Sequence, residues 1–142
     1  MTRLTLAQAM VEFAIVGSAF FVLLYGVFEL GRLMFEYSSV ANAAREGART
    51  GAIAGRNDAT VTARVREVII APGATAVVQI SNYSVDSATP VANQTPVAFS
   101  TATPRAAGDL IKVTVSYPYA PVAFIKLPGT LTLTSSAEMV VE

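Results

Sequence analysis

The first third of the chain is dominated by an apolar run. From Phe13 to Phe28 the sequence contains no charged residue, and at about 1.5 Å per residue this run corresponds to about 24 Å of helix. The preceding apolar residues from Ala9 to Val11 extend it to the roughly 30 Å of a bilayer's hydrocarbon core. Glu12 then lies inside the apolar stretch. The pattern predicts a membrane-inserted helix that carries one acidic side chain.

The helical pattern continues beyond the apolar run. Apolar or small residues recur at spacings of three and four as far as Ala48, and no proline occurs before Pro72. We therefore predict one helix from about Leu6 to about Ala52. Three acid–base pairs are spaced to meet along its surface, namely Glu29 with Arg32, Arg32 with Glu36, and Glu46 with Arg49.

A second, shorter helix is predicted after the first. Asn57 or Asp58 is placed to cap its start, because short polar side chains accept hydrogen bonds from the first free backbone N–H groups. Pro72 and Gly73 are placed to end it. Its apolar face consists of Val61, Val65, Val68 and Ile69. Asp58, Asp86 and Asp109 each adjoin turn residues, which predicts capping or turn formation for all three.

The rest of the chain has the pattern of β-strands. Apolar and polar residues alternate from Leu110 to Val115, as expected of a half-buried strand. The predicted strands are Ala76–Tyr83, Asp109–Tyr117 and Thr130–Val141. The stretch from Asp86 to Gly108 is rich in Ser, Thr, Pro and Ala, which predicts a long surface loop. The prolines expected to keep the last connection out of regular strand are Pro118, Pro121 and Pro128.

Together these elements predict an α+β fold, in which a long hydrophobic N-terminal helix packs on a small antiparallel β-sheet head. Residues 1–7 form a candidate leader, residues 8–52 the long membrane or filament-core helix, and residues 53–142 the head domain. Ala41, Ala44 and Ala48 are the residues expected to pack the helix against the head, since small side chains allow a close approach. The expected shape is a lollipop with an apolar stick.

Three interpretations of the N-terminus remain open. Arg3 fits the basic start of a cleaved secretory signal, but no small-residue cleavage site ends the apolar run. A plain single-pass anchor is the second interpretation. The third is a short leader removed before an apolar run that stays in the mature protein. Cleavage between Ala7 and Gln8 would make Glu12 the fifth mature residue.

Glu12 favours the third interpretation. A charge inside a bilayer is costly and usually marks a function or a partner. Its carboxylate could pair with the new amino terminus of a neighbouring subunit, which would neutralise two charges that neither partner could bury alone. If the leader is retained, the amino group of Met1 or the side chain of Arg3 of a neighbour are the alternatives. Glu12 could instead lie at the headgroup boundary and reach water.

The chain carries residues typical of one known family. The segment from Ala7 to Val16 resembles the start of TadE-like pseudopilins of the tight-adherence (Tad) pilus system. The segments 28–32 and 41–49 are similar to the family's next signature, and residues 113–119 match its C-terminal pattern. Such families normally have Gly where this chain has Ala7. The resemblance implies a pilin-like fold, a prepilin peptidase that removes the leader, and assembly with other pilins.

Composition excludes several other classes of protein. The 142 residues include ten basic and ten acidic side chains without a basic block, so there is no electrostatic footprint for nucleic acid. Cys and His are absent, which removes thiolate chemistry, the commonest general base and the commonest metal ligand. No phosphate-binding loop or nucleophile elbow occurs. We therefore expect no catalytic residues, no metal site and no cofactor.

The leading hypothesis is a structural subunit of an extracellular pilus-like filament. It would lie in the inner membrane before assembly and on the cell surface afterwards, in contact with copies of itself or with related pilins. Residues expected to make these subunit contacts are Glu12, Phe13, Ala14, Gly17, Ser18, Phe21, Leu24 and Phe28. The alternatives are a monomeric membrane-anchored module that binds an envelope partner, and a minor pseudopilin that initiates assembly.

Overall fold

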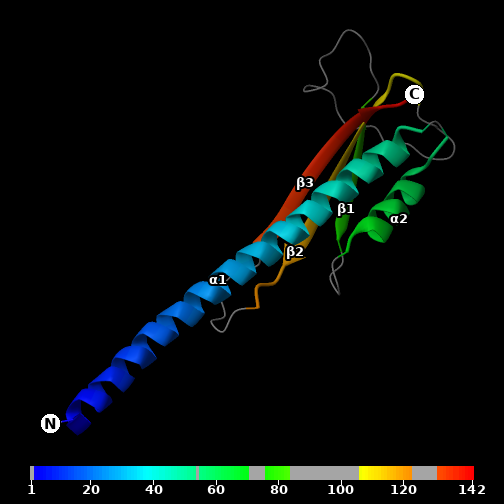
Figure 1. Ribbon diagram of the computed structural model, residues 1–142. Coiled ribbons are helices and arrows are strands. Elements are labelled where there is room, and N and C mark those ends of the chain that lie inside the picture. Colours follow the sequence, from blue (N-terminus) through cyan, green and yellow to red (C-terminus); the bar gives the residue numbers. More distant parts are fainter. Residues whose placement is uncertain (1, 54, 71–75, 84–105, 123–130) are drawn as a thin grey trace. The chain divides into compact units, whose positions relative to one another are not determined.

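The chain combines two helices with one antiparallel sheet (Figure 1), and this confirms the α+β class. The computed structural model describes residues 2–53, 55–70, 76–83, 106–122 and 131–142. The chain forms two compact units, residues 1–34 and residues 35–142; we call the second the head unit. The elements in chain order are α1 (Thr2–Gly51), α2 (Asp58–Val68), β1 (Val77–Tyr83), β2 (Leu110–Tyr119) and β3 (Leu131–Val140).

The predicted long helix is confirmed as α1, which begins at Thr2 and ends at Gly51. Its last turns are rich in alanine, the best helix former, and no proline interrupts it. The predicted second helix is confirmed as α2. It ends at Val68, with Ile69 already in extended backbone, so the expected stop at Pro72-Gly73 lies outside the described residues. The expected loop at 86–108 lies mostly outside them as well.

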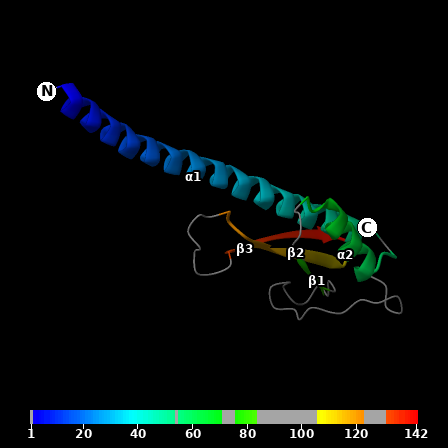
Figure 2. The same ribbon diagram turned by 90° about the horizontal axis from the view of Figure 1, so that it is seen from below.

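The sheet is a three-stranded meander in the order β1-β2-β3, with both pairings antiparallel. Residues of β2 alternate along the strand, as its sequence pattern predicts: Ile111, Val113 and Val115 are fully buried, and the residues between them are half-buried. One face of the sheet therefore belongs to the core. Figure 2 shows that the final turns of α1 and the short helix α2 lie on that side.

The opposite face of the sheet carries polar cross-strand pairs. Lys112 stands opposite Glu138 in the register, with Nζ 2.8 Å from Oε1, and the hydroxyls of Ser116 and Thr134 lie 3.3 Å apart. The hydrogen bond to Glu138 and the charge of that carboxylate raise the pKa of Lys112. On the alkaline side, the stability that this shift contributes is therefore present below the ordinary pKa of lysine and is lost as the pH rises through the raised pKa of Lys112. This face is built to meet water.

Pro118 corrects one expectation, because it lies inside β2 opposite Thr132 of β3. The pairing of β2 with β1 ends at Ser116. Beyond that point β2 is an edge strand on the β1 side among the described residues, and a proline is tolerated where no neighbouring strand needs its missing N–H. Pro121 lies outside the strands, as expected, and Pro128 is not among the described residues.

A tight turn at residues 106–109 precedes β2, and its backbone is hydrogen-bonded to Val141, the residue that follows β3. The Asp109 carboxylate accepts a hydrogen bond of 2.7 Å from the backbone N–H of Ala106, and Gly108 between them has a φ of +95°, which favours glycine. The backbone N–H of Val141 donates to the Asp109 carbonyl at 2.7 Å. The turn role predicted for Asp109 is therefore confirmed. Asp86 lies outside the described residues.

The start of α2 is capped by Asn57 rather than by Asp58, which is the first residue of the helix. The Asn57 side chain accepts hydrogen bonds from the backbone N–H of Thr60 at 2.9 Å and from its hydroxyl at 2.8 Å. This cap satisfies one of the N–H groups that a helix start leaves unpaired.

Replacing Asn57 by alanine is expected to lower the free energy of unfolding by about 1 kcal/mol, because it removes the cap without touching the core. Urea unfolding of the full chain in mild detergent measures this difference. Asn57→Ser is the matched control, since serine caps almost as well and should keep most of the stability. Equal losses in the two variants would contradict the assigned cap.

Candidate functional site

The most unusual surface of the protein is the apolar part of α1 within the first unit, residues 6–34. Its large hydrophobic side chains are exposed: Phe13 is 79%, Phe21 70% and Phe28 67% exposed. By length and composition the helix over Leu6–Gly51 could cross a membrane, and none of its most apolar window is buried. A helix that is hydrophobic all round is normally covered by lipid or by other protein. We call residues 6–34 the apolar segment.

The residues predicted to make subunit contacts all lie on this segment, and all of them except Glu12 fall in one stripe that is about 140° wide. At about 100° per residue, Glu12 lies on the side of α1 opposite Ala14 and Phe21. Phe13, Gly17, Leu24 and Phe28 lie on the same side as Phe21, within about 80° of it. Glu12 is exposed. An assembly that used all of these residues would contact this stripe and, separately, the side of the helix that carries Glu12.

The small residues of the segment have specific local roles. The Ser18 hydroxyl donates to the carbonyl of Ala14 at 2.7 Å, so its polar group is satisfied within the helix. A Cβ atom added to Gly17, Gly26 or Gly31 would meet nothing within 4 Å. Space beside these glycines is therefore open for a neighbouring helix, as small residues allow in membranes.

Ala7 and Gln8, the candidate cleavage residues, lie within α1 and are exposed. Gln8 precedes Glu12 by four residues, which is one helical turn. Cleavage between Ala7 and Gln8 would therefore create a positive amino group one turn from the Glu12 carboxylate. That geometry is compatible with pairing inside one chain or between two neighbouring chains.

Charged side chains form two further pairings along α1. Glu29 and Arg32 lie 3.4 Å apart, which confirms the pairing expected from their spacing. Glu46 was expected to pair with Arg49; it binds Arg64 of α2 instead, at 2.9 Å from Nη2 and 3.2 Å from Nε. Hydrogen bonds to Glu46 and then to Glu67 raise the pKa of Arg64. Helix spacing alone missed this pair, because it ignores partners that are distant in the sequence.

The last turns of α1 form the centre of the head core. Ala44 and Ala48, two of the predicted packing residues, are fully buried, and Ala41 is only half-buried. Val40 and Ala43 are also fully buried; they lie on the same face, and the three-and-four spacing 40, 43, 44, 47, 48, 51 could have revealed them.

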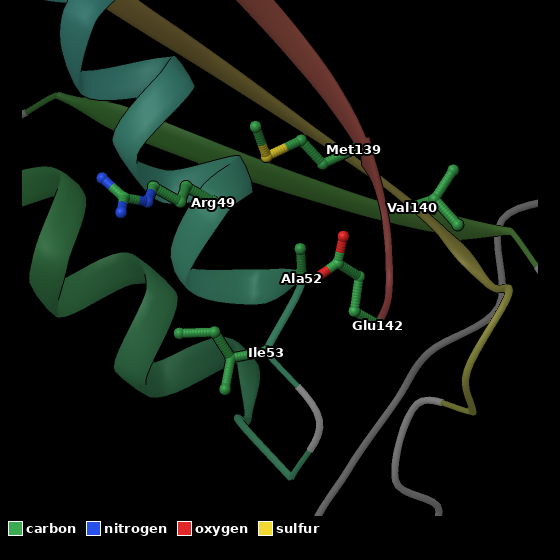
Figure 3. Close-up of a pocket in the computed structure, with 6 residues that line it drawn as sticks. All are labelled: Arg49, Ala52, Ile53, Met139, Val140 and Glu142. Atoms are coloured by element: carbon green, nitrogen blue, oxygen red, sulfur yellow. The ribbon is translucent and has the colours of Figure 1, made fainter.

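A shallow groove of about 730 Å³ opens at the end of the head unit (Figure 3). It is lined by Arg49, Ala52, Ile53, Met139, Val140 and Glu142. The backbone N–H of Glu142 donates to the carbonyl of Ala52 at 3.0 Å, which ties the end of the described chain to the end of α1. Its walls are mainly apolar, and the ionisable side chains that line it are Arg49 and Glu142. In the described part of the chain, no group of three His, Cys, Asp or Glu side chains could hold a metal ion.

Comparison with known proteins gives one finding, and it concerns the helix that contains the apolar segment. Searches among curated proteins and among solved structures give no match. Residues 7–49 match the family model described as TadE-like protein. The match begins at the candidate cleavage residue and ends in the last turns of α1, so it covers the part of the chain on which the resemblance was strongest. Over residues 7–49 the chain is similar to TadE-like proteins.

Proposed function

We propose that this protein is a structural, pseudopilin-type subunit of a Tad pilus-like filament, assembled through the apolar segment with the head unit on the outside. The observation that carries this is the exposed apolar segment of α1, followed in the same helix by turns that are buried in a folded head. A structural role fits the TadE-like match, since these proteins are pilus components and not enzymes.

The energetics of the apolar segment support assembly over release as a monomer. Exposing a large apolar side chain to water costs roughly 1.5–3 kcal/mol, and many such side chains lie exposed between Leu6 and Met34. The helix can therefore leave a bilayer only if something else covers it. Because the apolar residues surround the helix, several sister helices would cover it better than one partner.

Glu12 gives the assembly a direction and a register. A carboxylate among apolar side chains needs a cation nearby, and the new amino terminus at Gln8 of the same or a neighbouring subunit would supply one after cleavage. Helices that slid along one another without restraint would lose this pairing. The minor-subunit role, in which a few copies start assembly, uses the same contact.

The distribution of the chain between surface material and membranes tests the proposal. Material sheared from intact cells is expected to contain this chain in filaments, and mass spectrometry of that material should show an N-terminus at Gln8. The membrane fraction should also contain unassembled chain. Recovery of the chain only from membranes, with no copy in sheared filaments, would favour the monomeric anchored module and would exclude the proposed role.

A further inference from the structure

Many of the charged side chains among the described residues form ion pairs, and others do not. Ion pairs join Glu29 with Arg32, Arg64 with Glu46 and Glu67, and Lys112 with Glu138. Among the described residues, no acidic side chain lies within ion-pair distance of Arg45 or Arg49, and no basic side chain lies within that distance of Glu12.

Arg45 and Arg49 share one exposed face of α1. They are one helical turn apart, with Asn42 one turn before Arg45, and all three are exposed. At about 100° per residue this face lies opposite Val40 and Gly47, which pack into the head core. Arg45 therefore lies on the side of α1 away from the core, and Arg49 lies on the same exposed face where it borders the groove beside β3.

The acidic side chains nearest to these two arginines in the head unit do not pair with them. Glu142 lines the same groove as Arg49, but Figure 3 shows the Arg49 guanidinium pointing away from the Glu142 side chain. Glu46, the acid next to Arg45 in the sequence, is held by Arg64. In a filament with its heads outside, the exposed face of α1 would turn toward neighbouring subunits. Two arginines that become buried there on assembly would need an anionic partner.

We propose that this arginine face, Arg45 and Arg49, receives the Glu12 carboxylate of a second copy of the chain. Arginine donates parallel hydrogen bonds to a carboxylate, and Glu12 is the unpaired acid of the apolar segment. A carboxylate has room for several donors, so the same Glu12 also accepts from an amino terminus at Gln8. The inference rests on the proposed function and adds to it a second contact surface and a register.

The pairing fixes an offset between contacting helices. At about 1.5 Å per residue, the interval from Glu12 to Arg45 corresponds to about 50 Å of helix, and the interval to Arg49 to about 55 Å. Two parallel copies in contact through these groups are therefore displaced by that amount along the filament. The same offset brings Ala9 of one copy beside Asn42 of the other.

Charge exchange tests the pairing in the full chain. Filament yield is expected to fall at least tenfold in Glu12→Arg and in the double variant Arg45→Glu/Arg49→Glu, and to recover at least partly when all three changes are combined. Arg66→Glu is the matched control, because Arg66 is an exposed arginine on α2; its filament yield should be unchanged. Circular dichroism of each variant in detergent checks that the head remains folded.

Cross-linking tests the offset independently. The sequence has no cysteine, so Ala9→Cys and Asn42→Cys chains can be expressed together and treated with a short bismaleimide in sheared filaments. A mixed dimer is expected for this pair and not for Ala9→Cys with Arg66→Cys.

Normal filaments from the arginine double variant, or filaments without the 9–42 cross-link, would overturn the pairing and leave the proposed function intact. If the arginine double variant is lost from the membrane fraction but still forms normal filaments, the partner of the arginines is lipid phosphate. That result would also overturn the pairing with Glu12. An unmodified chain that forms no filaments would overturn both.

Discussion

Replacing Gly47 by valine is expected to lower the free energy of unfolding of the head unit by about 3 kcal/mol, through overpacking of its core. A Cβ atom at Gly47 would lie 2.5 Å from Cγ2 of Val65 and 3.1 Å from Cγ1 of Val113. Both neighbours are β-branched side chains with little rotamer freedom, so the helix and the sheet would have to move apart.

Gly51 provides an informative comparison. A Cβ atom there would overlap Cδ1 of Ile111 and lie 3.2 Å from Cγ2 of Val61. The Ile111 atom is the end of a longer side chain that can rotate, so Gly51→Ala should cost less than Gly47→Ala. Gly31→Ala is the control, since nothing lies within 4 Å of its added Cβ and alanine favours helix. Urea unfolding of the full chain in detergent measures all of these. Equal stability of Gly47→Val and Gly31→Ala would contradict the packing described.

Replacing Glu12 by alanine is expected to abolish filaments or reduce them at least tenfold, while membrane insertion stays intact. Alanine removes the only charge between Gln8 and Phe28, so insertion becomes easier. Under the proposed function, assembly then loses the charge that would select one register among many apolar ones. Glu12→Gln should behave like alanine, because it keeps the shape of the side chain and loses its charge.

Filament yield and the amount of chain in the membrane fraction must be measured together for the Glu12 variants. Val16→Ala is the matched control: Val16 lies one turn further along the same side of α1, and its replacement removes apolar volume without removing charge. A defect confined to the Glu12 variants would support the pairing role. Normal filament yield from both Glu12→Ala and Glu12→Gln would show that the carboxylate does not set the register.

Much of the fold could be predicted because the patterns are local. The long helix follows from an uninterrupted three-and-four spacing, and β2 from strict alternation between Leu110 and Val115. The cap at Asn57 could not be separated from one at Asp58, since both residue types cap well and only the backbone at the helix start decides between them. Pro118 was expected outside a strand, because the sequence does not show that the β1 pairing ends at Ser116.

The contacts that depend on tertiary packing were less predictable. Glu46 has an arginine three residues later in its own helix, yet its partner is Arg64, which the fold brings from α2. In the same way, Ala41 was predicted to pack in the core because of its spacing, but Ala43 is the residue that is fully buried. The spacing along the helix allows either residue at the edge of the buried face, and the position of the sheet decides between them. The arginine face could be recognised only after the buried side of α1 was known.

The central claim is that the apolar segment exchanges lipid for the same segment of other subunits. Cryo-electron microscopy of sheared surface filaments tests it most directly. The account predicts a filament whose core consists of α1 helices packed side by side over residues 6–34, with head units on the outside. A filament core built without these helices would contradict it.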